Sequence, residues 1–261
     1  MAQLFRKLKR AVFNYDPSFC DMYEDARART AAEEYLTHIR THLHRRFGQQ
    51  SLTILDAGCQ AGRLLIPLAQ DGHRMIGIDT SGFALRRTRQ HARRLGLRVR
   101  LHRGSIAALR QWVAPASLDA VVCTEVLYLC ENHRELLRLM AQSVKPGGLL
   151  CMSHRPRLYY VATAIRKHRV EHLASLMTQT EGPSSEGEYH NWQTPELLGR
   201  MYAEHGLNML DCLPVDHVAQ PLDVNGTMPA DARELLQAVA IAPATFRIPS
   251  YLLVIAQRPS A

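Results

Sequence analysis

Two acidic residues and two glycines stand where backbone groups could hold a small molecule. Asp56 lies near the end of an apolar run typical of a short buried strand, and Gly58 and Gly62 follow in the turn before a helical pattern begins. Such a turn lets the backbone approach a ligand closely, and the next helix directs its first N–H groups to the same place. Asp79 ends a second apolar run, where its carboxylate could accept hydrogen bonds from both ribose hydroxyls of a nucleoside. These residues predict a nucleoside site at the carboxyl ends of parallel strands.

The turn does not fit the glycine pattern of nicotinamide- or flavin-binding proteins. Counted from Gly58, Gly-x-Gly-x-x-Gly requires glycine at positions that Gln60 and Arg63 occupy. Asp56 would suit a cationic ligand, whereas a phosphate-binding loop has no use for a carboxylate there. The pattern Asp-x-Gly-x-x-x-Gly, followed by an acid at the end of the second strand, resembles the first two motifs of the class I S-adenosylmethionine-dependent methyltransferases.

Three later landmarks extend the resemblance in the expected order. Gly104-Ser105-Ile106 follows a third predicted strand, at the place where the family usually has an acid that binds the adenine amino group. A fourth strand over 118–123 leads into Thr124-Glu125, and Lys145-Pro146-Gly147-Gly148 predicts a tight turn before a fifth strand. Spacings of roughly 20–30 residues between these strands are those of β–α units. Asn-Pro-Pro-Tyr is absent, which argues against methyltransferases that modify amino groups of DNA bases or glutamine.

The resemblance implies an α/β fold: a Rossmann-like, seven-stranded, mostly parallel sheet whose last strand is antiparallel, with helices on both faces and helical cap insertions. It also implies S-adenosylmethionine as cofactor and S-adenosylhomocysteine as product. By position in the motifs, the implied cofactor-binding residues are Asp56, Gly58, Cys59, Gln60, Gly62, Asp79, Thr80, Ser105, Ile106, Thr124 and Glu125. In the family, a tyrosine or arginine near the amino terminus commonly lies at the methionyl end, and the candidates here are Tyr23, Arg27 and Arg29.

Two positions depart from the family pattern. Gln60 stands where the first motif usually has its middle glycine, and its side chain would point toward the methionyl part of the cofactor. Ser105 replaces the usual acid, so its hydroxyl could accept a hydrogen bond from adenine but without the assistance of a charge. Both departures bear on how tightly the cofactor is held.

The length of 261 residues suits one methyltransferase domain over 1–261, without a linker that separates two units. We expect a helical lid over 1–50, with a long helix over 26–47, and a cofactor-binding core over 51–153. An amphipathic first helix, with leucines opposite Arg6, Lys7, Lys9 and Arg10, could lie on a membrane or dock on its own domain.

The carboxyl-terminal part is predicted to hold two insertions. Residues 154–189 form a cap insertion with a helix that reaches Met177; in family members acting on small molecules, such an insertion commonly covers the substrate pocket. Residues 190–261 hold a helix that Thr194 caps and Pro195 opens, a second insertion over 221–249 with a helix around 230–239, and a final antiparallel strand over 251–256.

Composition excludes several classes of protein. The hydrophobic content of 46% is that of a globular chain, and no apolar run reaches the roughly 18 residues of a membrane span. No signal-peptide core follows the basic amino terminus. The six cysteines have neither Cys-x-x-Cys nor metal-site spacing, which predicts a reduced cytoplasmic protein without a metal.

The formal net charge is +8, and arginines cluster from Arg86 to Arg103. Such a surface could steer nucleic acid, an acidic substrate or an anionic membrane, or it could be a solvated helix face. We favour the solvated face, because no aromatic platform interleaves the arginines as single-strand binders require.

Methyl transfer from a sulfonium needs alignment and exclusion of water more than a dedicated side chain. A hydroxyl or carbon nucleophile would still benefit from a base. His154, at the end of the fifth strand, is the first candidate, followed by Tyr128 and His190; the equally weighted alternative is that His154 is a structural histidine. Trp192 and Tyr159 could wall a flat substrate or pack the cap.

Three hypotheses follow. The leading one is a methyltransferase acting on an O, N or C nucleophile of a small metabolite. The second is an RNA methyltransferase, which the positive charge permits. The third is a degenerate methyltransferase fold that serves as a binding protein, which only Gln60 and Ser105 support.

Overall fold

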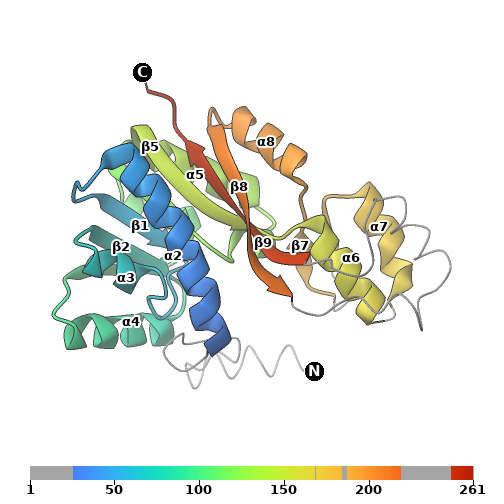
Figure 1. Cartoon of the computed structure of the whole chain (residues 1–261), viewed down its shortest axis with the longest axis horizontal. Helices are drawn as coiled ribbons and strands as arrows, with labels where there is room; N and C mark the ends of the chain where they lie inside the picture. Colours follow the sequence, from blue (N-terminus) through green and yellow to red (C-terminus); the bar gives the residue numbers. More distant parts are fainter. Residues whose placement is uncertain (1–25, 168, 184–186, 219–247, 261) are drawn as a thin grey trace.

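The computed structural model describes residues 26–167, 169–183, 187–218 and 248–260. A seven-stranded sheet in the order β3-β2-β1-β4-β5-β9-β8 forms its centre (Figure 1). Its strands are β1 (Thr53–Ala57), β2 (Arg74–Asp79), β3 (Val99–Arg103), β4 (Leu118–Cys123), β5 (Val144–His154), β8 (Asn208–Val218) and β9 (Ile248–Gln257). The first five strands run parallel, and β9 is antiparallel to both neighbours, β5 and β8. The predicted mostly parallel sheet with an antiparallel last strand is confirmed.

Helices cover both faces of this sheet. One face packs against α2 (Ala26–Phe47), α3 (Leu65–Gln70) and α4 (Gly82–Arg94), as the shared cluster of buried side chains shows. The other face packs against the 3₁₀ helix η1 (Ile106–Gln111), α5 (His133–Ser143) and α8 (Pro195–Glu204). Because β1 and β4 are buried on both sides, their residues from Ile54 and from Leu118 onward are apolar apart from Asp56 and Asp119, rather than alternating.

Local signals explain where the helices begin and end. The Ser81 hydroxyl accepts a hydrogen bond from the Ala84 N–H at the start of α4, and Gly96, with a φ of 67°, lies just beyond its end. The Thr194 hydroxyl caps α8 in the same way, and Pro195 is its first residue. The predicted start of this helix, with Thr194 as cap and Pro195 as first residue, is confirmed.

The cap is a small unit with its own core at one end of the sheet (Figure 1). It contains α6 (Arg157–Arg166), η3 (Val170–His172), α7 (Leu173–Thr178) and the hairpin of β6 (Glu181–Pro183) and β7 (Tyr189–Asn191). Trp192, 1% exposed, packs with Tyr160 in this core. The prediction of one helix reaching Met177 was wrong, because the chain turns after Arg166 and α7 packs back on α6.

Two further predictions have a different outcome. The Lys145-Pro146-Gly147-Gly148 segment was expected to be a turn before the strand, but it forms the irregular first part of β5, where Gly147 has a φ of 78° and its carbonyl accepts from Arg46 Nε. The amino-terminal helix, Tyr23 and the helix around 230–239 lie outside the described residues, and Arg27 is described only in its backbone.

Candidate active site

The glycine turn between β1 and α3 wraps over the end of β2. The N–H groups of Gly58 and Cys59 both donate to the Ile78 carbonyl, at 2.8 and 3.2 Å. Gly58 and Gly62 have φ angles of 84° and 87°, in the region that favours glycine. A Cβ on Gly58 would also collide with the side chain of Val126. The turn therefore needs glycine for both its conformation and its close packing.

Gln60 adopts a left-handed conformation in the same turn, with a φ of 43°. Its N–H donates to Asp79 Oδ2 at 2.8 Å, its carbonyl accepts from the Thr88 hydroxyl at 2.6 Å, and its side chain is exposed. The backbone here has the conformation that the usual glycine would take, so glutamine is accommodated at a conformational cost of roughly 1–2 kcal/mol.

The Asp79 carboxylate holds two loops at once. Oδ2 accepts from the Gln60 N–H, and Oδ1 accepts from the Ser81 N–H at 2.7 Å. Two backbone donors fix the orientation of the carboxylate at the carboxyl end of β2, and a carboxylate oxygen can accept more than one hydrogen bond. This geometry suits the pair of hydroxyls on a ribose.

Asp56 is a buried acid beneath the turn, 3% exposed. Burial raises the pKa of its carboxyl to about 7; Arg63 opposes this rise, Asp79 adds to it, and the Leu65 N–H bonds the carboxyl. A cation placed over the turn would favour the charged form of Asp56. The sulfonium and ammonium groups of S-adenosylmethionine have that charge.

Arg63 and Glu125 form an ion pair at the carboxyl end of β4. Arg63 Nη2 donates to Glu125 Oε1 at 2.6 Å, and the two side chains are 19% and 24% exposed. Glu125 has a φ of 61°, and its N–H donates to the Ser153 hydroxyl at 2.6 Å. The hydroxyl of Tyr251 donates to Glu125 Oε2 at 2.9 Å. Glu125 therefore links the glycine turn to strand β9.

A cluster of tyrosines surrounds Arg155, just beyond the end of β5. The guanidinium carbon lies 4.1, 4.4 and 4.6 Å from the ring centroids of Tyr159, Tyr251 and Tyr128. Nη2 donates to the Tyr251 hydroxyl at 2.6 Å and to the Tyr128 hydroxyl at 3.1 Å. The buried Nε has no hydrogen-bond partner among the described residues. We call Tyr128, Arg155, Tyr159 and Tyr251 the arginine–tyrosine cluster.

His190, from the cap hairpin, extends this cluster. Its ring is nearly parallel to that of Tyr128, with 6.1 Å between centroids, and lies 5.4 Å from that of Tyr160. Nδ1 is 3.1 Å from the Glu188 carbonyl oxygen. Two of the three predicted catalytic candidates, Tyr128 and His190, are thus brought together.

His154 lies elsewhere. It is 1% exposed, and its Nε2 is 2.8 Å from the Tyr202 hydroxyl of α8. Burial lowers the pKa of its imidazole to about 3, and His133 adds to this effect. The ring is on the sheet face opposite the cluster, with Leu150 and Met152. This placement favours the structural alternative over a general base.

Three further predicted cofactor residues, Thr80, Ser105 and Thr124, follow β2, β3 and β4 at the carboxyl edge of the sheet. Ser105 is exposed and its hydroxyl accepts from the Ala107 N–H at 3.2 Å, so the side chain caps η1, with Ile106 buried behind it. Thr124 is buried beside Glu125, and Thr80 is exposed after Asp79. Cys59 is buried, which raises the pKa of its thiol. Arg29 is exposed near the start of α2.

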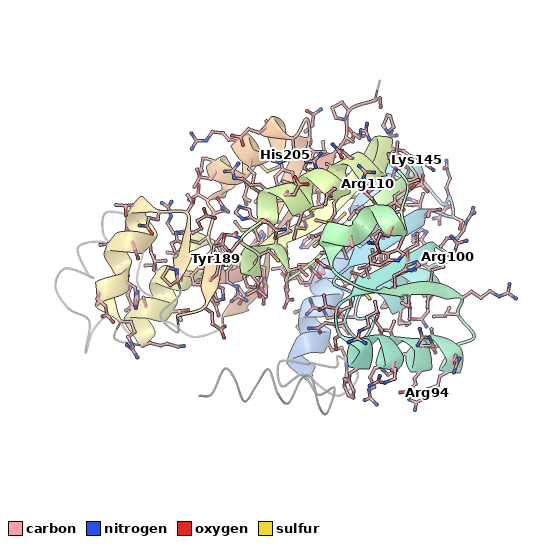
Figure 2. The ribbon with its side chains drawn as sticks, turned by 180° about the vertical axis from the view of Figure 1, so that it is seen from behind. Arg94, Arg100, Arg110, Lys145, Tyr189 and His205 are labelled. Carbon is pink, nitrogen blue, oxygen red and sulfur yellow. The ribbon has the colours of Figure 1, made fainter. Side chains whose placement is uncertain are left out.

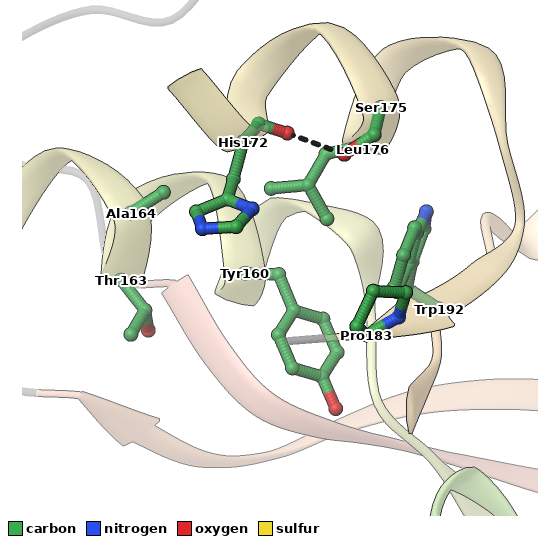
Figure 3. Close-up of a pocket in the computed structure, with 8 residues that line it drawn as sticks. All are labelled: Tyr160, Thr163, Ala164, His172, Ser175, Leu176, Pro183 and Trp192. Atoms are coloured by element: carbon green, nitrogen blue, oxygen red, sulfur yellow. Dashed lines mark hydrogen bonds between the residues drawn. The ribbon is translucent and has the colours of Figure 1, made fainter. Parts of the chain in front are cut away.

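A small separate cavity lies inside the cap. Tyr160, His172, Leu176 and Trp192 are among its lining residues (Figure 3). None of the predicted cofactor-binding or catalytic residues lines it. Tyr160 and Trp192 belong to both the cavity and the aromatic packing around His190, so the cavity is a feature of the cap core beside the site.

Sequence reasoning missed Arg63, Ser153, Arg155 and Tyr251. Arg63 directly follows the second motif glycine, so its position was a usable signal. Arg155 and Tyr251 are 96 residues apart in sequence, and nothing in either segment indicates their 2.6 Å hydrogen bond.

Comparison with known proteins places this chain in a family. A family model described as a methyltransferase domain matches residues 49–204. A ubiquinone biosynthesis O-methyltransferase from Nitrosospira multiformis is 28% identical over 186 residues, which cover 67% of this chain and 74% of that protein. A protein of the same description from Azoarcus sp. is 31% identical over 60% of this chain and 64% of its own length.

Solved structures show the same fold at low sequence identity. A 1,6-didemethyltoxoflavin-N1-methyltransferase from Burkholderia thailandensis, with 1,6-didemethyltoxoflavin and S-adenosylhomocysteine bound, matches with a TM-score of 0.61 at 15% identity, covering 100% of this chain and 91% of that one. A magnesium protoporphyrin IX methyltransferase from Synechocystis, with bound S-adenosylhomocysteine, matches with a TM-score of 0.58 at 15% identity. The match covers 99% of this chain and 100% of that one.

The fold and the family match together define a class I methyltransferase, and the chain belongs to the methyltransferase domain family. It is a methyltransferase that uses S-adenosylmethionine. The residues present fit this cofactor: Asp79 presents an oriented carboxylate, Asp56 and Glu125 are acids beside the glycine turn, and the turn leaves the backbone approachable.

Proposed function

We propose that this enzyme transfers the methyl group of S-adenosylmethionine to a nucleophile of a small aromatic metabolite, at O, N or C. The observation that carries the proposal is the position of Glu125. One of its oxygens pairs with Arg63 of the glycine turn, and the other accepts from Tyr251 of the arginine–tyrosine cluster. The cofactor turn and an aromatic cluster are therefore separated by one carboxylate.

The cluster has the chemistry to hold a flat acceptor. Tyrosine rings offer apolar faces for stacking, and their hydroxyls together with Arg155 offer polar groups at the edge. Tyr159 and His190 come from the cap, whereas Tyr128 and Tyr251 come from the sheet side, so an acceptor between them would contact both units. The relatives named above, a ubiquinone biosynthesis O-methyltransferase and a 1,6-didemethyltoxoflavin-N1-methyltransferase, are consistent with a small acceptor.

The cofactor supplies an activated methyl group when bound. The residues of this chain orient the ribose through Asp79, pair with positive charge through Asp56 and Glu125, and exclude water with aromatic side chains. If Nδ1 of His190 donates to the Glu188 carbonyl, the lone pair lies on Nε2, which is then the ring atom able to take a proton from an acceptor hydroxyl. His190 is therefore our first candidate for a base, with Tyr128 next to it.

No feature of the described site favours an RNA acceptor or a non-catalytic binding role over this reaction. The cytoplasmic location stays a prediction. No helix in the described part of the chain is long and apolar enough to cross a membrane.

Calorimetric titration with S-adenosylmethionine and S-adenosylhomocysteine tests the cofactor site first. We expect micromolar binding, and a folded protein without affinity for either compound would contradict the proposal. Transfer of a radiolabelled methyl group to a panel of hydroxylated and aminated aromatic acids then tests the acceptor class.

A pair of histidine variants tests the assignment of the base. His190→Ala should lower kcat by about 100-fold at neutral pH with S-adenosylhomocysteine affinity retained, because general-base catalysis typically contributes 10²–10⁴-fold. His154→Gln, which can still bond Tyr202, should leave kcat within a few-fold. A large loss of kcat in His154→Gln with little change in His190→Ala would instead identify His154 as the base.

A further inference from the structure

The positive charge of this protein is concentrated in one segment. Between Asp79 and Asp119 the sequence contains nine arginines and no acidic residue. This number exceeds the net charge of +8 of the whole chain, so the rest of the molecule is close to neutral. A solvated helix face usually mixes both signs, and a segment of one sign creates a field that attracts polyanions.

The arginines gather at the free edge of the sheet. Arg89, Arg93 and Arg94 are exposed on α4, Arg98 lies in the following turn, and Arg100 is exposed on β3, the first strand of the sheet order. Figure 2 shows Arg94 and Arg100 extending from the same end of the molecule. We call these five residues the basic edge.

The basic edge lacks the ion pairs found on other surfaces. None of its five arginines pairs with an acidic side chain in the described part of the chain. By contrast, Arg40 pairs with Asp71, Arg134 with Glu204 and Arg138 with Glu135. Unpaired exposed guanidinium groups remain available for an external anion.

An exposed apolar side chain among these arginines distinguishes a membrane partner from a nucleic-acid partner. Leu95 is 47% exposed and lies between Arg94 and Arg98, at the end of α4. An exposed leucine among arginines suits the headgroup region of a membrane, where charge meets phosphate and the apolar side chain enters the acyl boundary. Single-stranded nucleic acid would instead need exposed rings for stacking. Trp112 is already stacked on His102 at 5.4 Å, and the Phe83 ring lies beneath Arg86.

The position of Leu95 also shows that the basic edge is remote from the candidate site for the methyl acceptor. The turn that holds Leu95 and Arg98 precedes β3, so it lies at the amino-terminal ends of the parallel strands. The glycine turn and Glu125 lie at their carboxyl ends. A charged path for an anionic polymer substrate would surround the carboxyl ends, so the basic edge has a docking role rather than a substrate-guiding one.

We infer that the basic edge docks this enzyme on an anionic phospholipid surface, with Leu95 entering the headgroup region. Each arginine near such a surface contributes about fivefold to the partition coefficient, the equivalent of ~1 kcal/mol. Binding therefore falls as salt rises, because salt screens exposed charges.

Co-sedimentation of the full chain with vesicles tests this inference. Wild-type protein should bind vesicles of phosphatidylcholine mixed with phosphatidylglycerol and should not bind phosphatidylcholine alone. The triple variant Arg93→Gln, Arg94→Gln, Arg98→Gln should bind the mixed vesicles about 100-fold less. The triple variant Arg134→Gln, Arg138→Gln, Arg169→Gln removes the same charge from ion-paired, exposed positions and should bind like wild type.

A leucine pair tests insertion. Leu95→Ser should weaken vesicle binding several-fold, whereas Leu210→Ser, at a 51% exposed leucine of β8, should not. Retained S-adenosylhomocysteine affinity establishes that each variant is folded. Absence of vesicle binding by wild type, or equal losses in both triple variants, would overturn the inference. So would tighter binding to a single-stranded RNA that Leu95→Ser leaves unchanged, because that result assigns the basic edge to nucleic acid.

Discussion

The glycine turn and the arginine–tyrosine cluster lie side by side but are built by different means. The turn and the loop after β2 use backbone N–H groups of Gly58, Gln60 and Ser81, directed at one carbonyl and one carboxylate. The cluster uses side chains from segments far apart in sequence, such as Arg155 and Tyr251. A site built from backbone groups depends on few side chains, whereas a side-chain site changes with each substitution. This difference suits a site for a shared cofactor next to a site for a particular acceptor.

Glu125 contacts both regions and marks the boundary between them. Its left-handed backbone is held by the hydrogen bond to Ser153, and its two oxygens face Arg63 and Tyr251. Variants on either side of Glu125 should therefore affect one region and leave the other unchanged.

The largest expected effect concerns the buried acid under the glycine turn. The pKa of Asp56 rises from 3.8 to about 7 because of burial, so the folded state retains this proton across a window in which the unfolded state has lost it. The stability due to this group is present below about pH 4 and is lost as the pH rises to about 7, by about 4 kcal/mol.

Urea unfolding at a series of pH values measures this effect. The free energy of unfolding of wild type should fall relative to that of Asp56→Asn between pH 4 and pH 7. His154 contributes in the opposite sense, since its lowered pKa costs stability as the pH falls below about 6.5. Only the difference between wild type and variant isolates Asp56, and parallel curves would contradict the assignment.

Asp79→Ala should come next in size. The variant loses an acceptor for two backbone donors and for the ribose, and two charge-assisted hydrogen bonds are together worth about 3 kcal/mol, or about 100-fold in affinity. Calorimetry with S-adenosylhomocysteine measures the loss. Asp79→Asn keeps one acceptor oxygen and should lose less, and equal affinity for wild type and Asp79→Ala would remove Asp79 from the site.

Arg155→Met tests the other region. Loss of the guanidinium removes three contacts with tyrosine rings and two hydrogen bonds, so the free energy of unfolding should fall by about 2 kcal/mol. Affinity for S-adenosylhomocysteine should stay within about twofold. Arg155→Lys, which keeps the charge without the planar donor group, should recover only part of the stability. A large fall in cofactor affinity would show that the two regions are not separate.

The smallest effect is expected for Gln60→Gly. Relief of the left-handed glutamine is worth roughly 1–2 kcal/mol, and the added freedom of glycine in the unfolded chain offsets roughly 0.5–1 kcal/mol of it. The net gain in the free energy of unfolding should be about 0.5 kcal/mol. Gln60→Ala shortens the side chain without relieving the backbone and is the matched control; a gain from this variant would locate the cost in the side chain.

The core and the cofactor turn could be predicted because their signals are local. The first strand with Asp56 near its end, the strand ending at Asp79 and the cap at Thr194 each depend on neighbouring residues, and all three are where the sequence indicated. The cap was predicted less well. Its helix breaks after Arg166 because α7 packs on α6, a contact between segments that propensity does not encode.

The candidate catalytic residues illustrate the same limit. His154 and His190 were both candidate bases in the sequence, and His154 ranked first because it ends the predicted fifth strand. The pleat of β5 turns His154 toward Tyr202, and the cap hairpin carries His190 to Tyr128. The alternation of side chains along a β-strand decides which face of the sheet a residue occupies. It does not decide which distant element covers that face.

The sequence by itself determined the succession of β–α units, the glycine turn and the acids at the ends of β1 and β2, because each arises from residues within one β–α unit. Only the tertiary structure decided that Glu125 joins Arg63 to Tyr251, that Arg155 lies among tyrosines, and that His154 is buried. Glu125 meets Arg63 and Tyr251 across 62 and 126 residues of chain, Arg155 meets Tyr251 across 96, and His154 meets Tyr202 across 48. The packing of the whole sheet and cap sets these distances.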